Sequence, residues 1–175
     1  MDEKKFAIAL TVLLFWTTTV YGDDDDEAIM ACVELMKPAY ADEMCCESMK
    51  SIDKFDDDMK ECKTKGSSEG STCADFECFL NKQGIMDGSK IIDDKAKSFL
   101  DGIAKEYPKE KNIIEVLKDE CLDGQYDQYP PEDGCIALKF YVCIYTNVMV
   151  ECNSWKDTKV CKEAADFAKK CKEAK

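Results

Sequence analysis

The feature that most constrains the fold is a set of twelve cysteines in a chain of 175 residues that contains no histidine. Zinc sites commonly use histidines or C-x2-C pairs, and the sequence has neither. An even number of cysteines in an extracellular chain is instead typical of a disulfide framework, in which each bridge contributes about 2–4 kcal/mol. We therefore expect disulfides to involve Cys32, Cys45, Cys46, Cys62, Cys73, Cys78, Cys121, Cys135, Cys143, Cys152, Cys161 and Cys171.

An extracellular location is itself predicted by residues 1–22, which have the pattern of a signal peptide. Two lysines precede an apolar run over 6–20, and small residues follow at the cleavage position. A membrane anchor is the alternative, but the run is shorter than the ~20 apolar residues of a spanning helix. The prediction is a secreted chain without membrane insertion. Its mature part, 23–175, is long enough for one domain and begins with an acidic tip at 23–27.

Charge and composition exclude several classes of function. A net charge of −13 disfavours nucleic acid and anionic membranes, because both bind basic surfaces. Without histidine there are no Ser–His or Cys–His nucleophile pairs, no His-ligated metal and no phospholipase A2 site. An enzyme that uses carboxylates alone has no motif to support it. We expect neither an enzyme nor a resident metal or cofactor.

Apolar residues recur at helical spacing along most of the mature chain. Residues 122–134 are rich in Asp, Gly, Tyr and Pro, and they predict an irregular connection. Residues 135–152 are apolar nearly all round, which is typical of a helix that is buried on most sides or lines a cavity. A strand over 140–150 is the alternative, although the absence of alternation favours a helix. The other predicted helices span 27–37, 42–62 (one or two), 72–83, 89–106 with Ser89 as N-cap, 109–121 and 158–170.

The spacing of the cysteines resembles that of insect odorant-binding proteins, and covers the whole mature chain. The matching separations are 26 residues from Cys46 to Cys73, 42 from Cys78 to Cys121 and eight from Cys143 to Cys152. The plus-C subgroup is similar in its cysteine doublet (45–46) and in its extra cysteines at 135, 161 and 171. The stretches ECFLNKQGIMDG (77–88) and ECNSWKDTKVCKEAADFAKKC (151–171) also look like that subgroup.

The resemblance implies an all-α fold, a disulfide-stapled bundle of about six to eight helices around an apolar cavity. It also implies that six cysteines pair first with third, second with fifth and fourth with sixth, so that the helix bearing Cys73 and Cys78 is stapled to two others. The implied bridges are Cys45 or Cys46 with Cys78, Cys73 with Cys143, and Cys121 with Cys152. The partners of the remaining six cysteines stay open.

In such a bundle a ligand would be held by burial of its apolar surface, with a few polar groups for orientation. Tyr141 and Tyr145, one helical turn apart, are candidate hydrogen-bond donors. Ordinary core packing is the alternative for each single residue, and the helix 135–152 as a whole is the better candidate. The candidate ligand-binding residues are Phe99, Leu100, Ile103, Ile113, Leu117, Leu138, Tyr141, Ile144, Tyr145 and Met149.

The predicted function is therefore a secreted carrier of small apolar ligands such as odorant-like or pheromone-like molecules. The alternative is a cavity-poor secreted interaction protein, such as a toxin-like or reproductive-fluid factor. Oligomeric state is open, a homodimer included. Since no side chain with an ordinary pKa between about 5 and 8 is present, we expect flat ligand affinity from about pH 7.5 to about pH 6.

Overall fold

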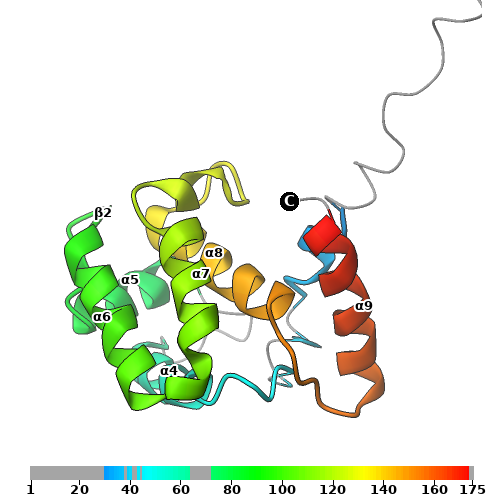
Figure 1. Ribbon diagram of the computed structural model, residues 1–175. Helices are drawn as coiled ribbons and strands as arrows, with labels where there is room; N and C mark the ends of the chain where they lie inside the picture. The colour runs from blue at the N-terminus through cyan, green and yellow to red at the C-terminus, as the bar shows by residue number, and fades with distance from the viewer. Residues whose placement is uncertain (1–29, 38, 41–42, 44, 64–71, 174–175) are drawn as a thin grey trace, which may run out of the picture.

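The computed structural model describes residues 30–37, 39–40, 43, 45–63 and 72–173. The predicted signal peptide and acidic tip lie outside these residues. The described part is mostly helical and stapled by disulfides (Figure 1), so the predicted all-α class is confirmed. None of the helices in these residues has the length and apolar character needed to span a membrane.

The helices agree well with the periodicity of the sequence. Residues 30–34 are helical, as expected within 27–37, and the strand considered for 140–150 is excluded because the segment is helical. The α-helices are α4 (Ser51–Cys62), α5 (Cys73–Lys82), α6 (Asp93–Glu106), α7 (Lys111–Cys121), α8 (Ile136–Val150) and α9 (Lys159–Glu173). Short 3-10 helices, η1 (Pro108–Glu110) and η2 (Gln125–Gln128), precede and follow α7.

The N-cap of α6 is Ile92, three residues after the predicted N-cap Ser89. Residues 86–91 form a two-stranded antiparallel hairpin, β1 (Met86–Asp87) and β2 (Lys90–Ile91), in which Met86 faces Ile91. Gly88 adopts a positive φ of 59° in the turn, a conformation that glycine accepts without strain. Because Met86 and Ile91 are both buried, packing of the hairpin outweighs the helical signal of Ser89.

Helix α8 is the centre of the core, as its apolar sequence predicts. It contacts α5, α7, η2 and α9, and in Figure 1 it runs behind α7 towards α9. Buried residues lie all round it, from Ala137 near its start to Val150 at its end. Helices α4 to α7 form the larger part of the bundle on one side of α8, and α9 covers the other end.

Six cysteines within this bundle pair in an interlocked order, first with third, second with fifth and fourth with sixth. Their bridges are Cys62–Cys78, Cys73–Cys135 and Cys121–Cys143. Helix α5 is thereby stapled to the end of α4 and to the residue before α8, so the expectation of one helix bound to two others is confirmed.

The other six cysteines form three nested bridges between the two ends of the described chain. A short β-bridge between Cys46 and Trp155, and a hydrogen bond from Glu47 N–H to the Ser154 carbonyl at 2.8 Å, bring these ends together. The nested bridges are Cys32–Cys171, Cys45–Cys161 and Cys46–Cys152.

The individual bridges implied by the resemblance are therefore wrong, although their order recurs in another set of six cysteines. Cys143 lies on α8 opposite the end of α7, and its Cα is 5.8 Å from that of Cys121. Cys152 lies beyond α8, in the segment that pairs with residues 45–47, and so it bonds to Cys46 instead. The eight-residue separation of Cys143 and Cys152 led the resemblance to take Cys152 as the sixth cysteine of the interlocked set. In the structure the sixth cysteine of that set is Cys143.

Candidate ligand-binding cavity

A cavity of about 110 Å³ lies inside the bundle, between α4, α5, α6, α7 and α8. Apart from two tyrosine hydroxyls its described lining is made of apolar side chains, and no charged residue is among them. The lining residues are Met49, Phe55, Met59, Phe76, Phe79, Leu80, Ile85, Phe99, Leu100, Ile103, Ile114, Leu117, Ala137, Phe140, Tyr141, Ile144, Tyr145 and Val148.

Most of the candidate residues from the sequence meet at this cavity. Those that line it are Phe99, Leu100, Ile103, Leu117, Tyr141, Ile144 and Tyr145. The three that do not are Ile113, Leu138 and Met149. Each of these is the chain neighbour of a residue that does line it (Ile114, Ala137 and Val148), and one step along a helix turns a side chain by about 100°.

Sequence reasoning missed the wall that α4 and α5 contribute. Phe76, Phe79 and Leu80 form an apolar stripe on α5, and this stripe was visible as the buried face of a helix. Which cavity the stripe faces depends on the Cys73–Cys135 bridge, which fixes the start of α5 beside the start of α8. The pairing expected for Cys73, with Cys143, would have set the start of α5 beside the middle of α8 instead.

Aromatic rings make up much of the wall. Phe55 of α4 meets Phe79 and Phe99 edge-on, with ring centroids 5.8 and 5.5 Å apart. On α8, Tyr141 lies 4.4 Å from Phe76 and stacks on Tyr145 at 6.0 Å. Such rings offer large apolar surfaces of fixed shape, which suits a neutral, apolar ligand.

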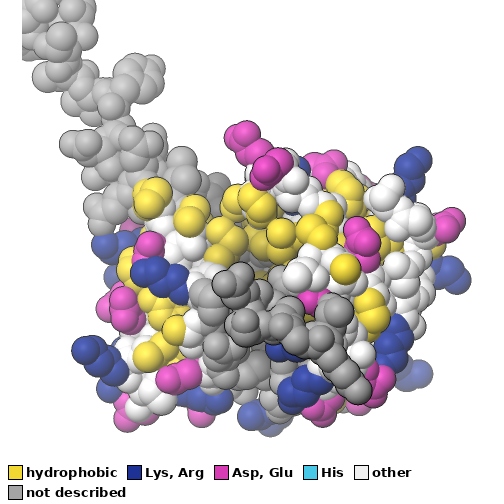
Figure 2. Space-filling view, turned by 180° about the vertical axis from the view of Figure 1, so that it is seen from behind, with side chains coloured by type: hydrophobic (Ala, Val, Ile, Leu, Met, Phe, Trp, Pro, Cys, Tyr) yellow, Lys and Arg dark blue, Asp and Glu magenta, His cyan; other side chains and the backbone are white. Residues whose placement is uncertain are grey.

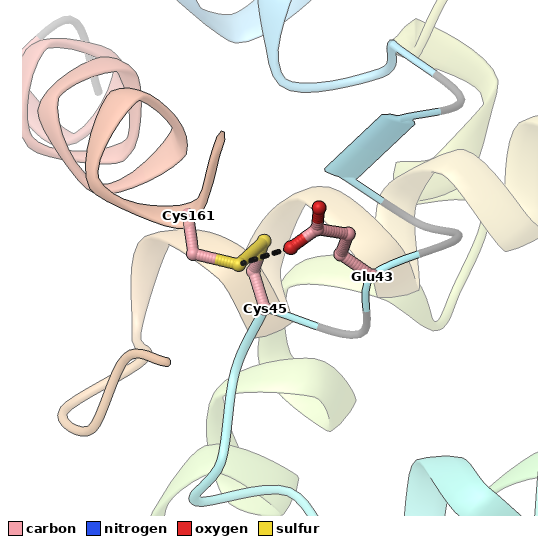
Figure 3. A group of neighbouring side chains, drawn as sticks. All are labelled: Glu43, Cys45 and Cys161. Carbon is pink, nitrogen blue, oxygen red and sulfur yellow. Dashed lines mark hydrogen bonds between the residues drawn. A yellow bond between two sulfur atoms is a disulfide. The ribbon is translucent and has the colours of Figure 1, made fainter. Parts of the chain in front are cut away.

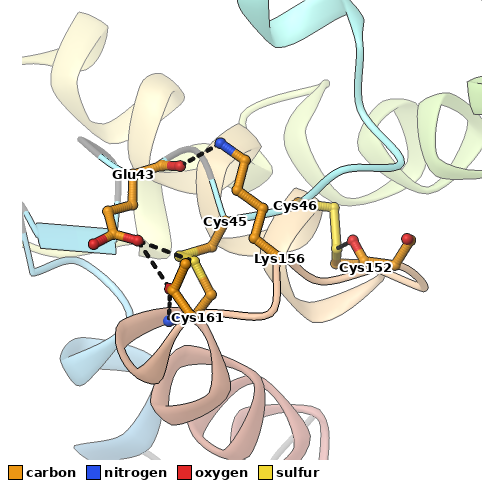
Figure 4. The surroundings of a disulfide bond; sticks show 8 residues. Glu43, Cys45, Cys46, Cys152, Lys156 and Cys161 are labelled. Atoms are coloured by element: carbon orange, nitrogen blue, oxygen red, sulfur yellow. Dashed lines mark hydrogen bonds between the residues drawn. A yellow bond between two sulfur atoms is a disulfide. The ribbon is translucent and has the colours of Figure 1, made fainter.

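A separate cluster of Glu43, Cys45 and Cys161 has the residue types and closeness of a metal site (Figure 3). Its two sulfurs are bonded to each other, so they are not the thiolates that bind metal ions. The carboxylate of Glu43 instead accepts a hydrogen bond from the Thr158 hydroxyl at 2.9 Å. The backbone carbonyl of Glu43 accepts one from the Lys156 ammonium at 2.7 Å (Figure 4). The cluster fastens the segment before α9 to the cysteine doublet.

Comparisons with known proteins find no relative. No family model matches the chain, and no curated protein or solved structure is similar to it.

Proposed function

We propose that the chain is a secreted carrier, similar to odorant-binding proteins, that binds small apolar molecules in the cavity between α4 and α8. The observation that carries this proposal is an uncharged, aromatic-rich cavity at the centre of a helical bundle. A packed core rarely leaves a space larger than a water molecule, because unfilled volume costs stability. A retained apolar space therefore favours a binding role.

The disulfides support the proposal in two ways. Six of them in one chain fit an oxidising, extracellular environment, and cross-links that constrain the unfolded chain compensate for a hollow core. The interlocked order of three of them is the order that the resemblance implies for the family.

The size of the cavity limits the part of a ligand that it can enclose. A cavity of about 150 Å³ holds one benzene molecule, and the cavity here is about 110 Å³. A micromolar dissociation constant needs about 8 kcal/mol, or more than about 300 Å² of buried apolar surface at about 25 cal/mol per Å². A carrier ligand of that affinity extends beyond this cavity or widens it.

Fluorescent-probe binding with two matched variants on α8 tests the proposal. The probe is N-phenyl-1-naphthylamine, whose emission rises in an apolar site, titrated into the oxidised protein. Ile144→Trp fills the cavity and is expected to weaken the probe at least about tenfold, because the larger ring takes the apolar space that the probe would occupy. Leu138→Trp adds the same ring on the same helix at a half-buried position outside the lining, and is expected to bind the probe like the parent.

The alternative is a secreted interaction protein, and a surface feature favours it. Figure 2 shows hydrophobic side chains gathered on one face among acidic and lysine side chains. Among the described residues, Met30, Val33 and Tyr141 are the large apolar side chains exposed at 56%, 43% and 36%. If the folded parent binds no apolar probe at micromolar concentration, the carrier proposal fails and this alternative takes its place.

A further inference from the structure

We propose, on the basis of the carrier function above, that the ligand is an amphiphile that occupies two connected spaces. Its apolar tail lies in the cavity, and its alcohol or amine head lies in a second pocket between α4 and α6. This α4–α6 pocket, of about 290 Å³, is lined among others by Phe55, Asp58, Phe99, Gly102, Ile103 and Glu106.

The two spaces share part of their walls. Phe55, Phe99 and Ile103 line both the cavity and the α4–α6 pocket. The edge-on pair of Phe55 and Phe99 stands at this boundary, with centroids 5.5 Å apart, and both rings are half-buried rather than fully enclosed. The two rings therefore form the boundary across which a ligand that occupies both spaces would pass.

The α4–α6 pocket differs from the cavity in chemistry. Its described lining brings the carboxylates of Asp58 and Glu106, the Gln83 amide and the Tyr107 ring to one place, and no lysine is among the residues described there. Asp58 accepts the Gln83 amide at 2.8 Å and is paired with the Lys82 ammonium at 3.7 Å. A head group that donates hydrogen bonds suits these acceptors, whereas a carboxylate head meets the like charge of Glu106.

Gly102 supplies the room for the head group. It lies within α6, where glycine is unfavourable relative to other residues, and a Cβ built on it would meet nothing within 4 Å. Gly102 is exposed at the mouth of the pocket that it lines, so a larger side chain there has room to extend over the pocket. Gly102 is therefore the residue that we infer determines whether the head group fits.

Displacement of N-phenyl-1-naphthylamine by three eight-carbon ligands tests the head group. The ligands are octan-1-ol, octylamine and octanoate at pH 7, where the amine is cationic and the acid anionic. We expect the alcohol and the amine to bind about fivefold more tightly than octanoate, the upper end for exposed charges that water screens. Glu106→Gln is expected to narrow this difference, whereas Glu132→Gln, an exposed change of equal charge away from the pockets, leaves it unchanged.

Gly102→Leu tests the place of the head group. Leucine is a better helix former than glycine, so the variant is expected to fold, and its side chain occupies the α4–α6 pocket. Octan-1-ol is expected to bind about tenfold more weakly because the head loses its hydrogen bonds and its space. Ser98→Leu, an exposed change one turn earlier on α6, is expected to bind like the parent.

The results separate this inference from the carrier function. If the probe binds the parent but octanoate competes as well as octan-1-ol, or Gly102→Leu leaves octan-1-ol unaffected, the two-space ligand is wrong and the carrier function stands. If no probe binds the parent, the carrier function itself has failed.

Discussion

Glu110 caps the first turn of α4 through Ser51, across 59 positions of sequence. Its Oε1 accepts the Ser51 backbone N–H at 3.1 Å, and its Oε2 accepts the Ser51 hydroxyl at 2.5 Å. The Lys50 N–H also donates to Oε1, at 2.5 Å. Both Glu110 and Ser51 are almost fully buried, at 2% and 1% exposure. The carboxylate thus joins η1 to the helix that carries Phe55 over the cavity.

Removing this carboxylate is expected to destabilise the protein and to loosen the cavity wall. Glu110→Ala leaves the buried Ser51 N–H and hydroxyl and the partly buried Lys50 N–H without their acceptor, which costs about 3 kcal/mol in the free energy of unfolding. Urea unfolding with the disulfides intact measures the loss. The exposed Glu132→Ala is the control and is expected to stay within about 0.5 kcal/mol of the parent. An equal effect of the two changes would contradict the capping role.

Because the three bridges are nested, we expect loss of the longest disulfide to lower the free energy of unfolding by less than its span suggests. Cys32 and Cys171 are 139 residues apart, but Cys45–Cys161 spans 116, so only the 23-residue difference is released when the outer bridge is lost. In the loop-entropy account this costs about 3 kcal/mol, whereas a free loop of the full span would cost about 5 kcal/mol. Urea unfolding of the double variant Cys32→Ala with Cys171→Ala distinguishes the two values.

The matched control is the double variant Cys62→Ala with Cys78→Ala, whose bridge spans 16 residues. It is expected to lose about 3 kcal/mol as well. A clearly larger loss for the outer bridge would show that the inner bridges do not hold the ends together.

Ligand affinity is expected to stay flat between about pH 7.5 and about pH 6, because the chain has no histidine to titrate there. Probe titrations at both pH values measure it, and the expected change is less than about twofold. Loss of the probe within this interval would mean that a carboxylate near the cavity titrates far above its ordinary range.

At alkaline pH the protein is expected to lose stability through Tyr126. This ring is buried edge-on against Phe140, with centroids 5.7 Å apart. Burial, followed by the negative charges of Asp127 and Asp93, raises the pKa of its hydroxyl. In the unfolded chain tyrosine ionises near pH ~10, so above that pH the unfolded state loses its proton first and the free energy of unfolding falls.

Tyr126→Phe removes the contribution of this hydroxyl to the loss of stability at alkaline pH. The slope of stability against pH above about 10 is expected to be shallower in the variant, although part of it remains because burial also raises the pKa of Tyr40. Urea unfolding at a series of alkaline pH values measures the slope. An unchanged slope in Tyr126→Phe would assign the alkaline loss to other groups.

The sequence predicted local structure better than long-range pairing. Helix α8 follows from a run that is apolar on all sides, and α5 and α7 begin and end within a few residues of their predicted bounds. The start of α6 was wrong because the pairing of Met86 with Ile91 is a tertiary effect that competes with a local N-cap signal. Periodicity shows which face of a helix is buried, but it does not show which other element packs against that face.

The same reason explains the partial prediction of the cavity. Phe99 and Ile144 could be named because the most apolar stripes of α6 and α8 face the core. Phe55 and Phe76 could not be placed, since their positions depend on two bridges, Cys62–Cys78 and Cys73–Cys135, that spacing alone did not identify. A correct pairing would have brought α4 and α5 to the cavity.

The outermost bridge also determines what a protease can do to this molecule. Cys32 is joined to Cys171, so a single cut of the backbone anywhere between them produces two pieces that remain covalently attached. The nicked chain would therefore keep its mass and its cross-linked frame until a reductant acts. Under non-reducing electrophoresis it would migrate as one band, and only reduction would reveal the fragments.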